Sequence, residues 1–265
     1  MRALGLRPRK HLSQSFLEDQ KVAASIVSAA RIDPNTDVLE IGPGLGVLTR
    51  LLARRARRVV AVELDAQLAN ALRADLAVQN VEVVTQDVLA FEPGPYFEEA
   101  FTVVANLPYH VTSPALRHLL SAGPPFARRL VVMVQAEVAE RITAAPGDMS
   151  ALAAAIQVQA RVQLVRRVPA TAFYPKPKVN SAVVVLEPLP EAARPIALTE
   201  HDEFVKLVQA GFKQPRKTLA NSMADGLAVP RDEALRRLGM AQIDPGLRAQ
   251  VLSVDDWVRL FRATL

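Results

Sequence analysis

The sequence contains no cysteine, so disulfides and thiolate metal sites are excluded. This absence fits a reducing compartment such as the cytoplasm. Long apolar runs are also missing, because the longest, in segments such as LVVMV and SAVVVL, fall far short of the roughly 20 residues that cross a bilayer. The first ten residues are basic but lack the apolar core of a secretion signal. We therefore expect a cytoplasmic protein without a membrane span.

The charge is only moderately unbalanced, with a formal net charge of +5 and a pI of about 9.8. The basic residues cluster in short segments, among them RPRK at 7–10, RRARR at 54–58 and KQPRK at 213–217. Such clusters bind phosphate polymers once folding brings them onto one face. For RRARR alone, a solvated helix face is an equally good interpretation.

The first two-thirds of the chain alternates β-branched runs with segments of helical periodicity. Nearly continuous Val and Leu indicates strands buried on both faces, as in a parallel sheet. Asp65 and Ser113 are suitable caps for two of the helices. This alternation predicts a doubly wound α/β sheet. Its expected strands are 37–42, 58–64, 81–86, 101–106 and 129–135.

The remaining third has a different pattern. Two strands, 162–168 and 181–187, flank a Pro-rich segment without a long helix, which predicts an antiparallel hairpin at the sheet edge. A Pro-rich linker at 188–195 follows, and after it the periodicity is entirely helical. We therefore predict a catalytic domain over 1–190 and a small all-helical domain over 196–265.

Three successive strand ends carry residues suited to a nucleoside. Gly42, Gly44 and Gly46 lie between a strand and a helix, where the backbone can approach a ligand. Their spacing differs from the G-x-G-x-x-G of dinucleotide folds, and a plain tight turn is the alternative. Glu63 ends the next strand, where a carboxylate can accept both ribose hydroxyls, and Asp87 ends the third, where it can accept from an adenine amine. Together they predict a nucleoside pocket.

The fourth strand ends in the segment NLPY, Asn106 to Tyr109. Pro108 biases Leu107 toward an extended conformation. The Asn106 side-chain oxygen and the Leu107 carbonyl can then point the same way and hold both hydrogens of an exocyclic amine, while the Tyr109 ring faces the base. The alternative is a simple Asn-x-Pro turn. Holding both hydrogens favours the pyramidal geometry that frees the lone pair of such an amine for attack.

Several segments resemble the KsgA/RsmA-type small-subunit ribosomal RNA adenine dimethyltransferases: KHLSQSFLEDQ, VLEIGPGLGVLT, VVAVELD, QDVLAF, VVANLPYHVTSP, PATAFYPKPKVNSAVV and GFKQPRKTLANSM. The resemblance implies a class I methyltransferase (Rossmann-like) fold that binds S-adenosylmethionine. The target that the resemblance implies is a pair of adjacent adenosines near the 3′ end of small-subunit ribosomal RNA in an assembling particle. The implied cofactor contacts are Ser15, Leu17, Gly42, Gly44, Glu63, Asp87 and Asn106, and the implied catalytic residues are Asn106, Leu107, Pro108, Tyr109 and Phe173.

The resemblance leaves some points open. Ser15 stands where the family usually has Asn or His, so its cofactor contact is expected to be weaker or water-mediated. Phe173 is expected to stack on the base opposite Tyr109, with a place in the core as the alternative. The expected RNA contacts are Lys176, Lys178, Lys213, Arg216 and Lys217. No metal is expected, and the protein is expected to be monomeric.

Three other functions fit parts of the sequence. A noncatalytic transcription or assembly factor of the same fold would not need intact cofactor motifs. A large-subunit ribosomal RNA adenine methyltransferase would share those motifs and an NLPY-like segment. A hydride-transferring dehydrogenase would need the other glycine spacing and would have no use for NLPY.

Overall fold

The computed structural model describes residues 15–76 and 79–264. The chain forms two compact units. The first contains the described residues up to Ala139 together with Val162–Pro188, and the second contains Glu140–Arg161 and the chain from Leu189 onward. The predicted division into 1–190 and 196–265 therefore has to be corrected for Glu140–Arg161, which belongs to the second unit. The Ala-rich segment after Ala139 packs with the C-terminal helices, because its small side chains join their apolar core.

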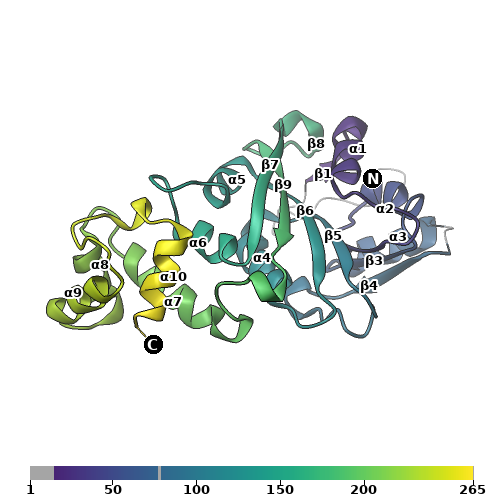
Figure 1. The fold of residues 1–265 in the computed structure, drawn as a ribbon. Helices are drawn as coiled ribbons and strands as arrows, with labels where there is room; N and C mark the ends of the chain where they lie inside the picture. The colour runs from purple at the N-terminus through teal and green to yellow at the C-terminus, as the bar shows by residue number, and fades with distance from the viewer. Residues whose placement is uncertain (1–14, 77–78, 265) are drawn as a thin grey trace. The chain divides into compact units, whose positions relative to one another are not determined.

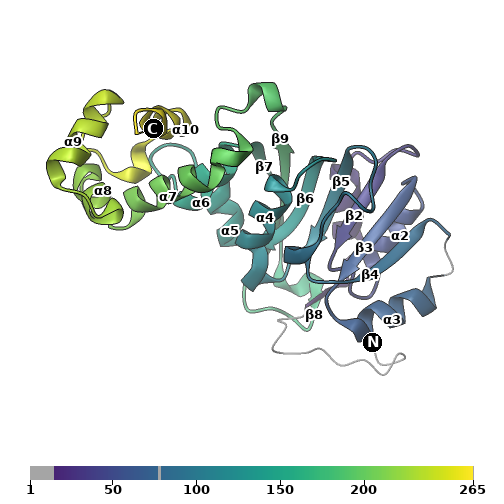
Figure 2. The same ribbon diagram turned by 90° about the horizontal axis from the view of Figure 1, so that it is seen from below.

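The first unit is built on a seven-stranded sheet with the order β4-β3-β2-β5-β6-β9-β7 (Figures 1 and 2). The pairs formed by β2 with β3 and β5, by β3 with β4 and by β5 with β6 are parallel, which confirms the predicted doubly wound sheet. The strands are β2 (Asp37–Ile41), β3 (Arg58–Glu63), β4 (Val81–Thr85), β5 (Phe101–Asn106), β6 (Ala127–Gln135), β7 (Ala160–Val168) and β9 (Ser181–Pro188).

The strands β2, β3, β5 and β6 are buried on both faces, as the Val-rich runs predict. The prediction is wrong for the edge strand β4, in which no residue is buried, and most residues of the other edge strand, β7, are exposed or half-buried. Val38, Val59 and Val104 pack on one face against the helices α1 and α2, and Leu39 and Val103 on the opposite face are equally buried. The helices of this unit are α1 (Gln20–Ala29), α2 (Val47–Ala53), α3 (Ala66–Asp75), α4 (Thr112–Ser121) and α5 (Ala136–Ile142), the last of which continues into the second unit.

The two predicted helix caps have different outcomes. The Asp65 carboxylate accepts a hydrogen bond from the Gln67 N–H at 2.9 Å and caps α3, as predicted. Ser113 lies inside α4, whose N-cap is Val111, so that prediction is wrong. A short 3₁₀ turn (Tyr109–Val111) runs directly into α4 and moves its start ahead of the serine.

The predicted hairpin strands are neighbours at the sheet edge, with β9 paired antiparallel to β6 and β7 outermost. The segment between them contains a 3₁₀ turn (Ala170–Ala172) and the strand β8 (Phe173–Tyr174). β8 pairs antiparallel with β1 (Phe16–Leu17), and Leu17 is the partner of Phe173. The sequence pattern did not indicate this second, two-stranded sheet, which brings two segments far apart in the chain together.

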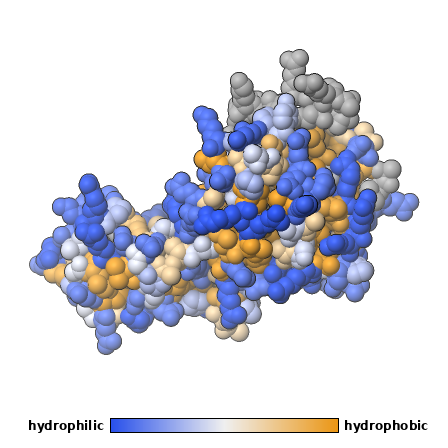
Figure 3. Space-filling model, turned by 90° about the horizontal axis from the view of Figure 1, so that it is seen from above, coloured by the Kyte–Doolittle hydropathy of each residue, from blue (hydrophilic) through white to orange (hydrophobic). Residues whose placement is uncertain are grey.

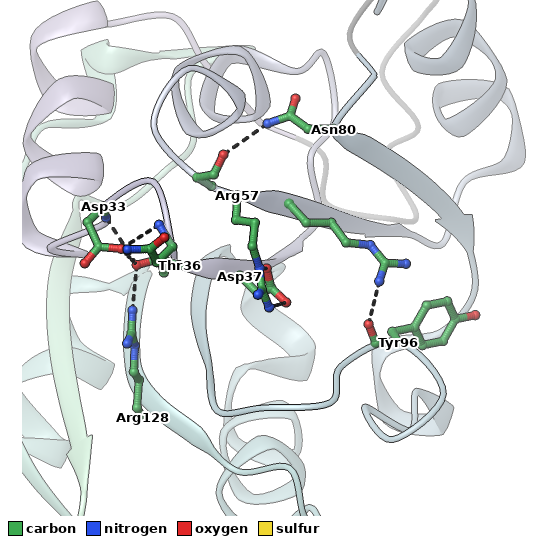
Figure 4. A network of polar contacts seen from close by, with 10 residues as sticks. Asp33, Thr36, Asp37, Arg57, Asn80, Tyr96 and Arg128 are labelled. Carbon is green, nitrogen blue, oxygen red and sulfur yellow. Dashed lines mark hydrogen bonds and ion pairs between the residues drawn. The ribbon is translucent and has the colours of Figure 1, made fainter.

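A polar network holds the amino end of the parallel sheet (Figure 4). The Arg57 guanidinium donates two hydrogen bonds to the Asp37 carboxylate, both of 2.8 Å. Arg128 donates to the Thr36 hydroxyl at 2.6 Å, and the Asn80 amide donates to the Ala53 carbonyl at 2.9 Å. These contacts tie the loops before β2, β3 and β4 together at the end of the sheet away from the motif-bearing strand ends.

The second unit is helical, and all the major elements after residue 196 are helices, as predicted. Trp257 is fully buried in its core and its ring stacks on Phe212, with centroids 5.6 Å apart. In the described part of the chain no helix is long and apolar enough to cross a membrane. On the face in Figure 3, hydrophilic residues surround the hydrophobic areas. The helices are α6 (Ala151–Gln157), α7 (His201–Phe212), α8 (Leu219–Leu227), α9 (Arg231–Met240) and α10 (Val254–Arg262).

Candidate active site

The strand register places the predicted residues at one edge of the sheet. Ile41 is the partner of Val62 in β3 and of Ala105 in β5, so the residues that follow each of them in the chain lie side by side. A cavity opens at this edge. Its lining includes Ser15, Phe16, Gly42, Gly44, Glu63, Leu64, Asp87, Asn106, Leu107, Pro108, Tyr109 and Phe173.

The glycine loop can approach the cavity only because it lacks side chains. Gly42 has a φ of +67°, in the left-handed region that favours glycine, and a Cβ placed on it would lie 3.2 Å from the Asn106 carbonyl oxygen. A Cβ on Gly44 would meet the Phe16 ring at 3.1 Å. The loop therefore leaves space at the cavity floor that any larger residue would fill.

Glu63 is held in a fixed orientation at the end of β3. One carboxylate oxygen accepts from the Gly44 N–H at 3.1 Å and the other from the Asp65 N–H at 2.9 Å. Burial raises the pKa of Glu63, while the two backbone N–H groups lower it. Each oxygen keeps a second lone pair, so the carboxylate can still accept ligand hydroxyls. The glycine loop and the acid are thus one hydrogen-bonded assembly.

Asp87 has a comparable arrangement at the end of β4. One of its oxygens accepts from the Leu89 N–H at 2.9 Å and caps a 3₁₀ turn (Val88–Ala90). The side chain is exposed and contributes to the cavity wall. The exposed Leu64 adds an apolar contact to this part of the wall that the sequence motifs did not indicate. The pair of acids frames a pocket with polar and apolar walls, as a nucleoside requires.

The NLPY turn is anchored at three points but leaves two acceptors free. The Leu107 N–H donates to the Met133 carbonyl at 3.2 Å, and the Thr112 hydroxyl donates to the Pro108 carbonyl at 3.2 Å. The Tyr109 hydroxyl is hydrogen-bonded to the Ser181 hydroxyl at 3.0 Å. Within the described part of the chain, no group forms a hydrogen bond with the Asn106 side chain or the Leu107 carbonyl. Both acceptors are available to a ligand.

The strands β1 and β8 also contribute residues to the cavity lining. Phe173 is 5% exposed and belongs to the core of the first unit, as the alternative interpretation expects. It also lines the cavity, and its stacking on a base remains a prediction. Ser15 lines the cavity beside Phe16. Leu17 does not, because its side chain packs into the core and lines only a smaller adjoining hollow. The predicted cofactor contact of Leu17 would therefore have to come from its main chain, and it remains a prediction.

The predicted RNA-binding cations differ in their surroundings. Lys176 and Lys178 are exposed on the loop after β8, in the same unit as the cavity. Arg216 and Lys217 are exposed in the second unit, and neither forms an ion pair with a described residue. Lys213 is different, because its ammonium pairs with the Asp225 carboxylate at 3.2 Å and donates to the Asp225 carbonyl at 3.0 Å. The basic segment 7–10 lies outside the described residues.

The comparisons with known proteins agree with this geometry. A family model described as ribosomal RNA adenine dimethylase matches residues 5–264. The chain is 42% identical over 98% of its length to ribosomal RNA small subunit methyltransferase A of Dehalococcoides mccartyi, covering 89% of that protein. It is 41% identical, again over 98%, to the protein of the same name from Desulfitobacterium hafniense, covering 94% of it. The chain belongs to the ribosomal RNA adenine dimethylase family.

Two solved structures show that this dimethylase is also similar to known proteins in its fold. A dimethyladenosine transferase from Plasmodium falciparum has a TM-score of 0.79 at 28% identity, covering 92% of this chain and 95% of that one. The 23S rRNA methyltransferase ErmE has a TM-score of 0.72 at 32% identity, covering 94% and 98%. These matches confirm the class I methyltransferase fold and decide against a hydride-transferring dehydrogenase.

S-adenosylmethionine is the cofactor of this dimethylase family, and the cavity fits it. The side-chain-free floor at Gly42, the oriented carboxylate of Glu63 and the exposed carboxylate of Asp87 suit a nucleoside with an attached cationic group. The free acceptors of the NLPY turn lie in the same cavity lining. The residues present therefore match what this methyl donor requires.

Proposed function

We propose that this protein dimethylates the N6 amino groups of two adjacent adenosines near the 3′ end of small-subunit ribosomal RNA, in an assembling particle. The small-subunit methyltransferase names of its 41–42% identical relatives support the substrate. The observation that carries the proposal is the pair of free acceptors, the Asn106 side chain and the Leu107 carbonyl, in the lining of the nucleoside cavity.

The two acceptors address the main chemical obstacle, the low nucleophilicity of an amine conjugated to adenine. Holding both N–H bonds favours a pyramidal nitrogen whose lone pair is free to attack. When bound, S-adenosylmethionine supplies an electrophilic methyl group on its sulfonium. The protein contributes position and exclusion of water rather than a base, because the amine becomes acidic only after it has been methylated. After the first transfer one acceptor is released and the pocket must accommodate a methyl group.

Tyr109 and Phe173 hold the target base in this proposal. Both residues line the cavity, and they come from different segments, the turn after β5 and the strand β8. An adenosine must leave its stack to enter, which costs a few kcal/mol and least in a loop. Stacking between two aromatic rings offsets part of this cost at roughly 1–3 kcal/mol per base.

Contacts to RNA phosphates are proposed for Lys176 and Lys178 near the cavity and for Arg216 and Lys217 in the helical unit. Their exposure and lack of ion-pair partners among the described residues support this role. Lys213 is the weakest of the five, since Asp225 already neutralises its charge. We further propose that the protein acts as a monomer in the cytoplasm.

The direct test is methyl transfer to purified small subunits that lack the modification. Incubation with labelled cofactor should give N6,N6-dimethyladenosine at two adjacent positions, measured by mass spectrometry of RNA fragments. Asn106→Ala should lower the rate roughly 100-fold or more, as for loss of one oriented hydrogen-bonding group in other active sites. Asn35→Ala, at an exposed turn residue, is the matched control.

Each possible result of this test separates the proposed function or mechanism from an alternative. Transfer only to large subunits would identify a large-subunit methyltransferase, in keeping with the structural similarity to ErmE. Binding to small subunits without any transfer would indicate a noncatalytic assembly factor. An Asn106→Ala protein that retains a rate within about tenfold of the wild type would refute the two-acceptor mechanism.

A further inference from the structure

The hydroxyl of Tyr109 is tied to a residue that does not line the cavity. It lies 3.0 Å from the hydroxyl of Ser181, which is 1% exposed in β9. Tyr109 follows β5, and β6 lies between β5 and β9 in the sheet. The phenol therefore reaches across the carboxyl end of β6 to a second strand, and its ring is fixed at both ends.

The residue before Ser181 is hydrogen-bonded to the segment that leads to Phe173. The Asn180 side-chain oxygen accepts a hydrogen bond from the Ala170 N–H at 3.0 Å, at the start of the turn that leads into Phe173. Its main-chain carbonyl accepts from the Ala136 N–H at 3.0 Å, at the end of β6. One dipeptide thus contacts both segments that carry the aromatic rings and is itself held to the central sheet.

The far side of Phe173 is also supported. Leu17 pairs with it across the two-stranded sheet, and the Glu18 N–H donates to the Ala172 carbonyl at 2.9 Å. The turn before Phe173 is therefore held between β1 on one side and Asn180 on the other. The segments that carry Tyr109 and Phe173 are far apart in sequence, so no local backbone geometry fixes the distance between the two rings. These hydrogen bonds are the contacts that can fix it.

We propose that Asn180 and Ser181 are positioning residues that hold Phe173 and Tyr109 as the two walls of the slot for the flat target base. This inference rests on the proposed function. Ser181 holds the Tyr109 hydroxyl in place and so keeps the ring from swinging away about the Cα–Cβ bond, and Asn180 holds the turn that presents Phe173. Neither residue lines the cavity, and both act through the residue that they hold.

The kinetic test compares variants that remove one hydrogen bond. Ser181→Ala and Tyr109→Phe should each lower kcat for methyl transfer roughly 10- to 100-fold, as expected when a reacting group is poorly oriented. The affinity for S-adenosylhomocysteine should stay within about twofold of the wild type. The double variant should be no slower than either single variant, because both break the same hydrogen bond.

Two further variants separate positioning from general stability. Asn180→Asp keeps the oxygen that accepts from Ala170 and should retain the rate, whereas Asn180→Ala should lose it. Thr102→Ala removes a hydroxyl that is also 1% exposed but lies at the amino end of β5, where it accepts from Arg128. It should reduce stability without changing kcat.

A measurement without substrate keeps this inference distinct from the proposed function. The chain has three tyrosines, so a spectrum of protein with ¹³C-labelled tyrosine contains few ring signals, and Tyr109→Phe assigns one of them. Ser181→Ala should shift and average the Tyr109 signals, while Thr102→Ala should not. If this change is seen but the wild type methylates no ribosomal particle, the positioning role stands and the proposed function fails. Unchanged Tyr109 signals and unchanged kcat in Ser181→Ala would overturn the inference.

Discussion

Glu40 provides the sharpest prediction about stability. It lies in β2 directly behind the glycine loop and is 1% exposed. Among the described residues, neither carboxylate oxygen has a hydrogen-bond partner. Burial, reinforced by repulsion from the Glu63 carboxylate, raises the pKa of Glu40 from 4.5 to about 8. The polar groups of neighbouring Thr49 act in the opposite direction, but the geometry does not make them hydrogen-bond partners of the carboxylate. At neutral pH the folded protein therefore holds this side chain as the neutral acid.

The sign of the pH dependence follows from this shift. Below pH 4.5 both the folded and the unfolded states carry the proton, and the group contributes no difference. Between pH 4.5 and about 8 only the folded state binds it, so the free energy of unfolding falls as the pH rises. The slope is about 1.4 kcal/mol per pH unit, which amounts to about 3 kcal/mol between pH 5.5 and 7.5.

Glu40→Gln removes the ionisation while keeping the shape of the side chain. The difference in unfolding free energy between this variant and the wild type should therefore grow in favour of the variant as the pH rises. Urea unfolding followed by far-ultraviolet circular dichroism at pH 5.5, 6.5 and 7.5, at constant ionic strength, measures it. Glu92→Gln, at an exposed position without a partner among the described residues, is the control and should give no such trend.

Parallel curves for the wild type and Glu40→Gln would refute this reasoning. They would mean that Glu40 is already ionised in both the folded and the unfolded state over this pH range, because a solvated carboxylate keeps its ordinary pKa and a paired one has a lower pKa. The only tryptophan, Trp257, lies in the second unit. Its fluorescence shows whether that unit unfolds in the same transition as the sheet that contains Glu40.

Two other predictions concern the cavity floor and the RNA contacts. Gly42→Ala should destabilise the protein by about 1–2 kcal/mol, because it forces a left-handed conformation on a residue with a Cβ, and should weaken S-adenosylhomocysteine binding through displacement of the Asn106 carbonyl. Calorimetric affinity within twofold of the wild type would contradict it. Arg216→Ala and Lys217→Ala should each reduce the slope of log affinity for RNA against log salt by about one, whereas Lys213→Ala should change it less, because Asp225 already pairs with that lysine. Equal effects in all three filter-binding titrations would show that this ion pair opens on the RNA.

Much of the cavity could be predicted from local sequence. Gly42, Glu63, Asp87 and Asn106 each lie at or just after the carboxyl end of a recognisable strand, and the carboxyl ends of parallel strands meet at one edge. The helical pattern after residue 196 was equally clear. These features depend on neighbours a few residues away, which is the range over which periodicity and turn chemistry act.

Other features could not be found in this way. The apolar runs indicated that Glu40 is in a strand, but not that its carboxylate would lack a partner in the folded protein. The chain between 140 and 161 has helical and strand character without any local sign that most of it packs with the C-terminal unit. The pairing of Lys213 with Asp225 likewise depends on how α7 and α8 pack. In the sequence, Lys213 resembles the nearby Arg216, which has no ion-pair partner among the described residues.

The sequence by itself determined the α/β alternation, the glycine loop and the two acceptors of the NLPY turn, because backbone preferences and short motifs specify them locally. Only the tertiary structure decided which residues support them. Tyr109 and Phe173 lie in the lining of one cavity, and Ser181 and Asn180 form hydrogen bonds with the two distant segments that carry them. Hydrogen bonds of that kind exist only after the strands have taken their order in the sheet, and no local pattern encodes them.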